Sequence, residues 1–429
     1  MSMGAIGDVE RGGGGVKDSR VFISRAPDLG KVSSFDGIRG VGVILVVVHH
    51  AWAIAESISG YIDLFFVLSG FLITTLIFEE QRKTGDISLR SFYTRRGVRL
   101  LPGLIAVLVL FWIPVALFAR DVLRLVTLES IATLFYVHNI FFPPLLGSAQ
   151  YMGQMWSLSL EEQFYLIGAV ATYAAIKRGW VRQLAVVLAG FVLFVWVARA
   201  MGHGGPGQFW FQRPDAIALG VVLAIVNAEL PRELTATTKK WLKRVAWVAL
   251  VLFVFGIFSS SALIDRVTGF YIPMYPGEEQ VPELANLEDK VPDDADYDDF
   301  VEVANEGIQI ALAELPNGNY WARWGFNLTT ATSAVLCFAL VRIRDEFRLT
   351  KWLSGRLIVY LGALSYIVYI SHYQLFKLMD PSGLGGWKWL PIKVVAAFLL
   401  GIALYKWVEQ PVQRRFRRRF VQQGPAKDG

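Results

Sequence analysis

An arginine and a histidine stand at the two ends of one apolar run, and their spacing suits chemistry inside a membrane. The run reads Arg39-Gly-Val-Gly-Val-Ile-Leu-Val-Val-Val-His49-His50. If it is helical, eleven steps of about 100° bring His50 to within roughly 20° of the face of Arg39. The rise of about 16 Å is roughly half the hydrocarbon thickness of a bilayer. One face then carries a fixed cation near the surface and a titratable base near the midplane, where ionisable groups are usually functional.

His50 has the properties of a general base. A neutral imidazole can take a proton from a hydroxyl near neutral pH, and burial keeps the ring neutral. A carboxylate on the other ring nitrogen would fix the tautomer, and the candidates are Asp63, Glu161 and Glu162. The alternative for His50 is a structural, hydrogen-bonded histidine. His49 is rotated by about 100° from this face and is less suited to direct chemistry.

The elements that must position these residues are predicted to be membrane-spanning helices. The chain has 429 residues and is 54% hydrophobic, too apolar for a soluble domain of this length. Apolar runs of about twenty residues recur, which indicates an all-α, polytopic membrane protein. The net charge of +6 does not favour nucleic-acid binding, because the basic residues cluster beside apolar runs. We predict about ten spans, at 37–56, 61–80, 101–119, 156–176, 183–201, 213–229, 243–263, 321–341, 356–377 and 389–408.

The distribution of basic residues supports this count. With ten spans, the five basic clusters fall on one side of the membrane, at 82–99, 177–182, 232–244, 342–356 and 414–419. This predicts a multi-pass plasma-membrane protein with both termini in the cytoplasm. A further apolar stretch, 124–146, would move the later clusters to the other side if it crossed fully. We therefore expect 120–155 to stay outside, in a re-entrant or interfacial arrangement.

The predicted organisation has three parts. Residues 1–34 are Gly-rich and charged and are predicted to form a disordered cytoplasmic tail. Residues 35–415 form the membrane domain, and 416–429 form a basic cytoplasmic tail. An extracytoplasmic loop at 265–319 holds 14 acidic and two basic side chains. It is either simply solvated or a weak cation site or lid. The single cysteine, Cys337, excludes a multi-cysteine metal site, and we expect no metal.

Seven motifs, in order along the chain, resemble those of the acyltransferase family 3 membrane proteins. This family transfers acyl groups to hydroxyls of surface carbohydrates and related acceptors. The resemblance runs from 35 to about 415. Its motifs are Phe35-Asp36-Gly37-Ile38-Arg39-Gly40 ending at His50, Gly60 to Ile73, Phe92 to Pro102, Trp156-Ser157-Leu158-Ser159-Leu160-Glu161-Glu162-Gln163-Phe164-Tyr165, Arg213-Pro214-Asp215-Ala216, Ser365-Tyr366 through His372, and Glu409-Gln410-Pro411.

The resemblance implies acyl-CoA as a co-substrate, with acetyl the expected acyl group and no permanently bound cofactor. The implied acceptor is an extracytoplasmic glycan or glycolipid. Guanidinium groups suit phosphate binding, so the CoA phosphates are expected to meet Arg39 together with Arg95, Arg96 and Arg99. His50 would act as the catalytic base, supported by Glu161 and Asp63. Whether the transfer is direct or passes through an acyl-enzyme stays open.

Further residues are candidates for acceptor binding: Glu162, Arg213, Tyr369 and His372. Arg213 either closes an outer acceptor site or pairs structurally with Asp215. Tyr369 and His372 share a helix face, where acceptor contact and structural hydrogen bonding are both open. Ser69 lacks the Gly-x-Ser-x-Gly elbow of a serine nucleophile, so Ser69 and Gly70 are assigned to close helix packing.

Two other classes of function compete with an acyltransferase. A transporter or flippase of an envelope lipid or acylated intermediate would use His50 and Glu161 as a proton relay. A non-catalytic sensor is a third interpretation. The basic loop beside the Arg39–His50 face favours the enzyme.

Overall fold

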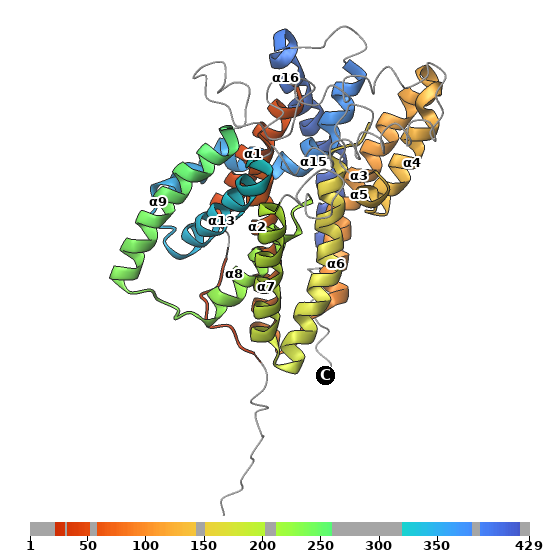
Figure 1. Cartoon of the computed structure of the whole chain (residues 1–429). Helices are drawn as coiled ribbons and strands as arrows, with labels where there is room; N and C mark the ends of the chain where they lie inside the picture. The colour runs from red at the N-terminus through yellow and green to blue at the C-terminus, as the bar shows by residue number, and fades with distance from the viewer. Residues whose placement is uncertain are drawn as a thin grey trace, which may run out of the picture.

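The protein is a bundle of helices packed side by side (Figure 1). The computed structural model describes residues 22–30, 32–51, 58–142, 151–201, 212–259, 320–379 and 387–420. These residues form helices and no strand, which confirms the predicted all-α class. The longer helices are α1 (Ser33–Ala51), α2 (Ile62–Thr84), α3 (Leu89–Phe118), α6 (Met155–Arg178), α7 (Val181–Ala200), α8 (Pro214–Glu229), α9 (Ala236–Phe258), α13 (Tyr320–Arg342), α15 (Arg356–Met379) and α16 (Leu390–Leu404).

Helices occupy all ten positions predicted as spans, but not all of them meet the criterion for crossing a membrane. Seven of the described helices are long and apolar enough: α1, α2, α3, α7, α9, α13 and α16 with its C-terminal extension. The other three, α6, α8 and α15, fall short by length or composition. A membrane protein with several spans is therefore supported, and the count of about ten stays a prediction.

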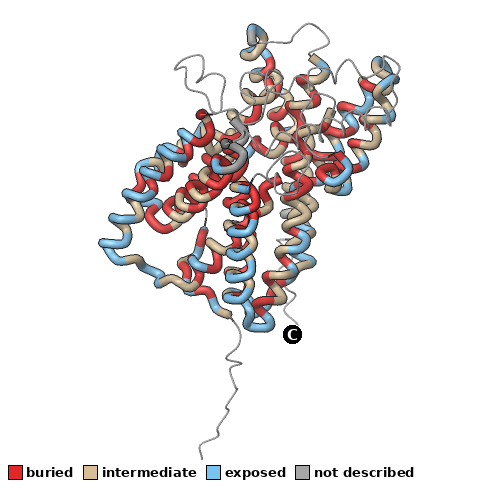
Figure 2. Tube along the Cα trace, in the orientation of Figure 1, coloured by how far each residue is buried: buried red, intermediate tan, exposed pale blue. Residues whose placement is uncertain are grey.

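The outer surface of the bundle is apolar, as lipid contact requires. Figure 2 shows exposed residues along the outward sides of α7 and α9 and buried residues toward the centre. Val186 on α7 is 72% exposed and Val251 on α9 is 66% exposed. Many other large apolar side chains are exposed on these and other helices, which is unusual for a soluble monomer. This surface fits a hydrocarbon environment.

Glycines bring the two central helices, α1 and α15, into backbone contact. A Cβ atom at Gly40 would overlap the backbone carbonyl of Ile358, and one at Gly362 would overlap the carbonyl of Asp36. Only residues without a side chain permit helix axes to approach this closely. A similar contact joins α2 to α8, where Gly70 faces Ile217, so the predicted packing role of Gly70 is confirmed. These contacts fix the face of α1 that carries Arg39 and His50 against α15.

The basic clusters lie at one end of the bundle. Lys177 at the end of α6 forms an ion pair with Asp86, in the turn between α2 and α3, at 2.8 Å. The hydrogen bond from Lys177 lowers the pKa of Asp86 below its ordinary value. Arg182 on α7 meets Glu229 at the end of α8, also at 2.8 Å. These contacts join the clusters of the first half of the chain.

The same end holds the clusters of the second half. Arg342 at the end of α13 donates to the carbonyls of Pro231 and Arg232, which follow α8. The C-terminal helix α17 (Gln410–Phe420) carries the last cluster and packs against α3. The predicted one-sided distribution of basic residues is thus present in the fold.

The described part of the stretch 124–146, up to Phe142, contains two short helices instead of a span. They are α4 (Leu123–Leu134) and α5 (His138–Phe141). Twelve residues of helix reach about 18 Å, which is too short for the hydrocarbon core. The carboxylate of Glu129 on α4 accepts hydrogen bonds from the backbone N–H groups of Tyr151 and Met152. This contact folds the segment back toward the start of α6, as expected for a stretch that does not cross.

The described part of the predicted N-terminal tail is packed. Within 22–30, Ala26 and Leu29 are buried. The backbone N–H of Arg25 donates to the carbonyl of Ala228 at 2.7 Å, and Arg82 donates to the carbonyl of Ala26 at 2.5 Å. This part of the prediction of disorder is wrong, because apolar and backbone contacts hold the segment against α2 and α8. Residues 1–21 and the acidic loop at 265–319 lie outside the described residues. The basic tail predicted from 416 is helical as far as Phe420, and 421–429 also lie outside.

Candidate active site

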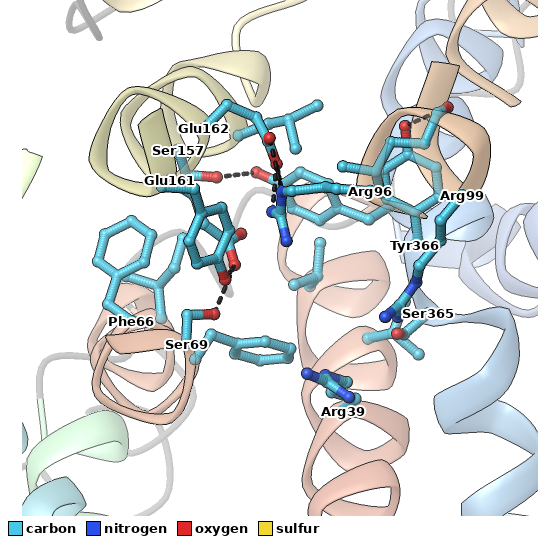
Figure 3. Close-up of a pocket in the computed structure, with 18 of the residues that line it drawn as sticks. Arg39, Phe66, Ser69, Arg96, Arg99, Ser157, Glu161, Glu162, Ser365 and Tyr366 are labelled. Atoms are coloured by element: carbon cyan, nitrogen blue, oxygen red, sulfur yellow. Dashed lines mark hydrogen bonds and ion pairs between the residues drawn. The ribbon is translucent and has the colours of Figure 1, made fainter. Parts of the chain in front are cut away.

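A central cavity of about 130 Å³ lies along the face of α1 that carries Arg39. Arg39, Val43 and Val46 of α1 line it, at the helical spacing that continues to His50. Helices α2, α3, α6 and α15 supply the other walls (Figure 3). This volume corresponds to roughly four water molecules, since one water takes about 30 Å³ in the liquid. The cavity can therefore take a small acyl group and part of its carrier, but not a whole nucleotide.

Arginines gather at one end of the cavity. Arg39, Arg96 and Arg99 all line it, and Figure 3 shows their guanidinium groups around one space. Arg39 is 3.5 Å from Asp36 on its own helix. Arg99 is exposed, so the cavity is reached from the surface beside it. Arg95 does not line the cavity and is instead exposed and paired with Glu80 at 3.3 Å. Three of the four arginines expected to meet the donor therefore lie together.

Glu162 neutralises one of these arginines. Its carboxylate accepts hydrogen bonds from Arg96, including one from Nε at 2.7 Å. The Arg96 guanidinium also lies over the ring of Tyr165, with Cζ 3.4 Å from the ring centroid. A charge held by a carboxylate and an aromatic face is fixed in place. Arg39 and Arg99 are thus the better candidates to meet an incoming anion, and Glu162, predicted to bind the acceptor, holds Arg96.

Glu161 lies on the cavity wall and is bonded to two hydroxyl groups. Ser69 Oγ donates to Glu161 Oε1 at 2.5 Å, and the Tyr165 hydroxyl donates to the same oxygen. Ser69 comes from α2, so its side chain has a polar role beyond the predicted helix packing. Its partner is 92 positions away in the sequence. Nothing local in the sequence signals this contact.

The nitrogen Nδ1 of His50 is 2.9 Å from Nε2 of His372 on α15. The ring of Tyr373 lies edge-on to His50, with centroids 5.2 Å apart. Among the described residues, the side chain that meets Nδ1 of His50 is thus a histidine, whereas Asp63, Glu161 and Glu162 bond elsewhere. The expected carboxylate on the second nitrogen of His50 is not what the structure shows.

Tyr369 links α15 to the start of α6. Its hydroxyl lies 2.5 Å from Ser157 Oγ and donates to the backbone carbonyl of Gln154, also at 2.5 Å. Tyr369 and Ser365 both line the cavity, whereas His372 reaches His50 beyond it. The predicted shared face of Tyr369 and His372 is present. It lies against α1 and α6 at the His50 end of the cavity.

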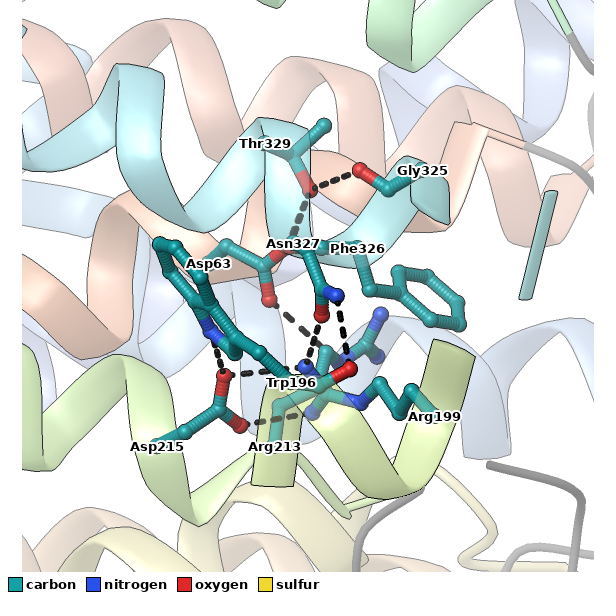
Figure 4. Close-up of polar contacts among 9 residues, drawn as sticks. All are labelled: Asp63, Trp196, Arg199, Arg213, Asp215, Gly325, Phe326, Asn327 and Thr329. Atoms are coloured by element: carbon teal, nitrogen blue, oxygen red, sulfur yellow. Dashed lines mark hydrogen bonds and ion pairs between the residues drawn. The ribbon is translucent and has the colours of Figure 1, made fainter. Parts of the chain in front are cut away.

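Asp63 and Arg213 belong to a separate buried network beside the cavity (Figure 4). Arg213 Nε lies 3.4 Å from Asp63 Oδ1, and Thr329 donates a hydrogen bond to Asp63 Oδ2. The Arg213 guanidinium lies 4.4 Å from the ring centroid of Phe326. Arg213 has φ +56°, an uncommon backbone conformation for a residue with a side chain. This arrangement places Asp63 away from His50, although both were expected in one catalytic group.

Asp215 pairs with Arg199 and not with Arg213. The two side chains form a bidentate pair at 2.6 and 2.9 Å, and both are fully buried. Trp196 Nε1 also donates to Asp215 at 2.9 Å, and Asn327 accepts from Arg199 at 3.1 Å. Sequence reasoning missed Arg199, whose only local signal is a charge near the end of an apolar run. The pair joins α7, α8 and α13 into a rigid support.

Known proteins similar to this chain are acyltransferases. A family model described as an acyltransferase domain matches residues 32–407. The putative peptidoglycan O-acetyltransferase YrhL of Bacillus subtilis is 25% identical over 420 residues, which cover 91% of this chain and 56% of YrhL. The peptidoglycan O-acetyltransferase OatA of Listeria monocytogenes is 34% identical over 162 residues, which cover 35% of this chain and 25% of OatA.

A putative O-acetyltransferase of Staphylococcus aureus is 29% identical over 217 residues, which cover 46% of this chain and 35% of that protein. The chain thus spans 56% or less of the length of these three relatives. No solved structure matches the chain. Because the family model covers most of the sequence and six of the seven predicted motifs lie within it, this protein belongs to acyltransferase family 3.

Proposed function

We propose that this protein transfers an acyl group, most simply acetyl, from acyl-CoA to a hydroxyl of an extracytoplasmic glycan or glycolipid. One observation carries the proposal. The cavity follows a single face of α1, with Arg39 and Arg99 at one end and His50 one helical turn beyond Val46 at the other. Phosphate-binding groups thus stand at one end of a small chamber, and a proton acceptor lies one helical turn past its other end. The relatives named peptidoglycan O-acetyltransferases support a glycan acceptor.

The donor would enter from the basic end, which we assign to the cytoplasm. The nucleoside part of CoA would stay at the surface beside Arg99, because the cavity is small, and the phosphates would reach inward from Arg99 to Arg39. Arg39 is three-quarters buried and lies deeper along the wall. Guanidinium groups bind phosphate oxygens through charge-assisted hydrogen bonds, which strengthen away from bulk water. The thioester end would then extend along α1 toward His50.

The transfer step would use His50 as general base. Its imidazole takes the proton of the acceptor hydroxyl, the alkoxide oxygen attacks the thioester carbonyl, and the C–S bond breaks. The proton then passes from His50 to the CoA thiolate, which leaves as the thiol. A base positioned for such a step contributes a rate factor of about 10² to 10⁴. The acceptor would approach from the end of the bundle where α1 ends and α6 begins.

Replacing His50 with Ala tests the proposal. We expect acetyl transfer to fall at least about a hundredfold, because no other base would take the hydroxyl proton. The measurement is CoA thiol release, with mass spectrometry of the acetyl ester, using purified protein in lipid nanodiscs with acetyl-CoA and soluble peptidoglycan fragments. His49→Gln is the matched control, since it changes the adjacent ring and should keep activity within about tenfold. Full activity of His50→Ala would contradict the proposed base.

A comparison of a deletion strain with its parent strain would identify the acceptor. Envelope glycans and lipids of a deletion strain should lack one set of acyl esters that the parent strain carries, as read by mass spectrometry. An unchanged set of esters, together with a change in the distribution of a lipid across the membrane, would favour the transporter alternative instead. In the structure, Glu161 bonds with Ser69 and Tyr165 rather than with His50, so a direct relay between His50 and Glu161 gains no support.

A further inference from the structure

The hydrogen bonds of His372 determine which nitrogen carries the proton in each ring of the His50–His372 pair. His372 is fully buried. Its Nδ1 lies 3.0 Å from the backbone carbonyl oxygen of Val368. A carbonyl can only accept, so Nδ1 of His372 must carry a hydrogen. A neutral imidazole has one N–H, and a charged ring without an anion would be costly at this burial. Nε2 of His372 is therefore an acceptor.

The hydrogen bond between the two rings then determines which nitrogen of His50 carries a hydrogen. Nε2 of His372 is 2.9 Å from Nδ1 of His50, so Nδ1 of His50 must donate. His50 is then protonated on Nδ1 and has its lone pair on Nε2. The hydrogen bonds thus form a chain in which His50 donates to His372 and His372 donates to the Val368 carbonyl. A neutral histidine thus takes the orienting position that a carboxylate occupies in many hydrolases.

We propose that His372 is the positioning residue of the proposed reaction, holding His50 in the tautomer whose Nε2 is the base. This inference rests on the proposed function. When the hydroxyl proton binds His50 Nε2, the Nδ1 hydrogen bond to His372 holds the charged ring in place, and His372 stays neutral. His50 then gives the Nε2 proton to the leaving thiolate. No proton is gained or lost by the pair over a complete transfer.

The position of the pair fits this role better than acceptor binding. Val46 and Tyr369 line the cavity, and each lies one turn from a member of the pair on its own helix. His372 packs among aromatic rings, including Phe376 at 5.7 Å between centroids. A fully buried ring with both nitrogens engaged has no edge left for a substrate. His372 therefore acts through His50, and the earlier assignment of His372 to acceptor binding is replaced.

Two substitutions separate orientation from packing. His372→Gln keeps a side-chain oxygen that can accept from His50 Nδ1, whereas His372→Leu fills similar space without an acceptor. We expect the Leu variant to lose about a hundredfold in kcat with acetyl-CoA and soluble peptidoglycan fragments, and the Gln variant to stay within about tenfold of the parent. The KM for acetyl-CoA should change less than about twofold in both, because the arginines lie at the other end. Equal losses in the two variants, or a parental kcat for His372→Leu, would overturn the proposal.

A direct observation of the tautomer makes the test independent of any substrate. The chain has five histidines, so ¹⁵N-histidine solid-state NMR in bilayers, assigned with single variants, can resolve His50. We expect a hydrogen-bearing Nδ1 and a bare Nε2 at His50 in the parent, and a mixture of tautomers in His372→Leu. A bare Nδ1 at His50 in the parent would refute the assignment. If His50→Ala is fully active, the proposed function fails; if His50→Ala is inactive and His372→Leu is unimpaired, only this inference fails.

Discussion

At the scale of residues, the site depends on pairs that come from different helices. The Arg39–His50 register is local, and helical periodicity alone predicts it. The partner of His50 is 322 positions away, and no local pattern connects the two histidines. The same holds for Ser69 and Glu161. Residue types and helix faces are therefore predictable here, whereas the pairing between faces depends on how the helices pack.

The different positions of Arg39 and Arg95 predict different effects on binding of the acyl donor. Arg39 lines the cavity, whereas Arg95 is exposed and paired with Glu80. Losing one phosphate contact of this kind should cost about 1.5–3 kcal/mol. We expect Arg39→Ala to raise the dissociation constant for acetyl-CoA by at least about tenfold, measured by calorimetry on protein in nanodiscs. The matched variant Arg95→Ala should change it less than about threefold, because exposed ion pairs contribute little. Equal effects of the two substitutions would contradict the donor role of Arg39.

At the scale of elements, close contact between α1 and α15 positions the face of α1 that carries Arg39 and His50. The hydrophobic runs predict where both helices lie, and the motif glycines indicate close packing. The packing of the helices in the folded protein determines which helix each glycine contacts. Gly362 on α15, for example, meets the backbone of Asp36 on α1. This contact holds the His372 side of α15 against the His50 side of α1.

Gly362→Ala should disturb this contact. Its new Cβ would overlap a backbone carbonyl that cannot rotate away, and overpacking of this kind costs about 1–3 kcal/mol. We expect a lower thermal midpoint in detergent and reduced acetyl transfer. The control is Gly190→Ala on α7, where a Cβ meets nothing within 4 Å and alanine is the better helix former. Its midpoint should be unchanged or slightly raised, and an equal fall in both variants would argue against the packing explanation.

The segments beside the long helices were less predictable. The stretch 124–146 is apolar enough to suggest a span, yet it divides into α4 and α5. The N-terminal segment 22–30 has a composition typical of a tail, yet its backbone bonds to α2 and α8 place it on the bundle. The hydropathy of a segment indicates whether it prefers water or lipid, and it does not predict which backbone groups the segment will contact.

At the scale of the whole molecule, the basic clusters define one end of the bundle. Their number and side follow from the sequence, and the contacts from Asp86 to Lys177 and from Arg232 to Arg342 place them together. Positive residues are retained on the cytoplasmic side of membrane proteins. The end with the arginines of the cavity is therefore the end we assign to the cytoplasm.

Cysteine labelling tests this orientation. Cys337 is buried and can be replaced by Ala, which leaves a chain without cysteine. In that background, Asp121→Cys lies exposed at the end opposite the basic clusters, and Lys240→Cys lies exposed among them. A membrane-impermeant maleimide should label Asp121→Cys in intact cells and Lys240→Cys only after permeabilisation. The opposite pattern would reverse the topology and place the donor arginines outside.

The sequence by itself determined the all-α membrane class, the one-sided basic clusters, the family, and the helix face that joins Arg39 to His50. Each of these depends on composition, on residue order or on the fixed periodicity of a helix. The tertiary structure alone decided that His372 faces His50, that Arg199 pairs with Asp215, and that Glu161 accepts from Ser69. Those contacts join helices far apart in the chain and depend on the rotation and depth of each helix against its neighbours, which close glycine contacts set for α1 against α15 and for α2 against α8.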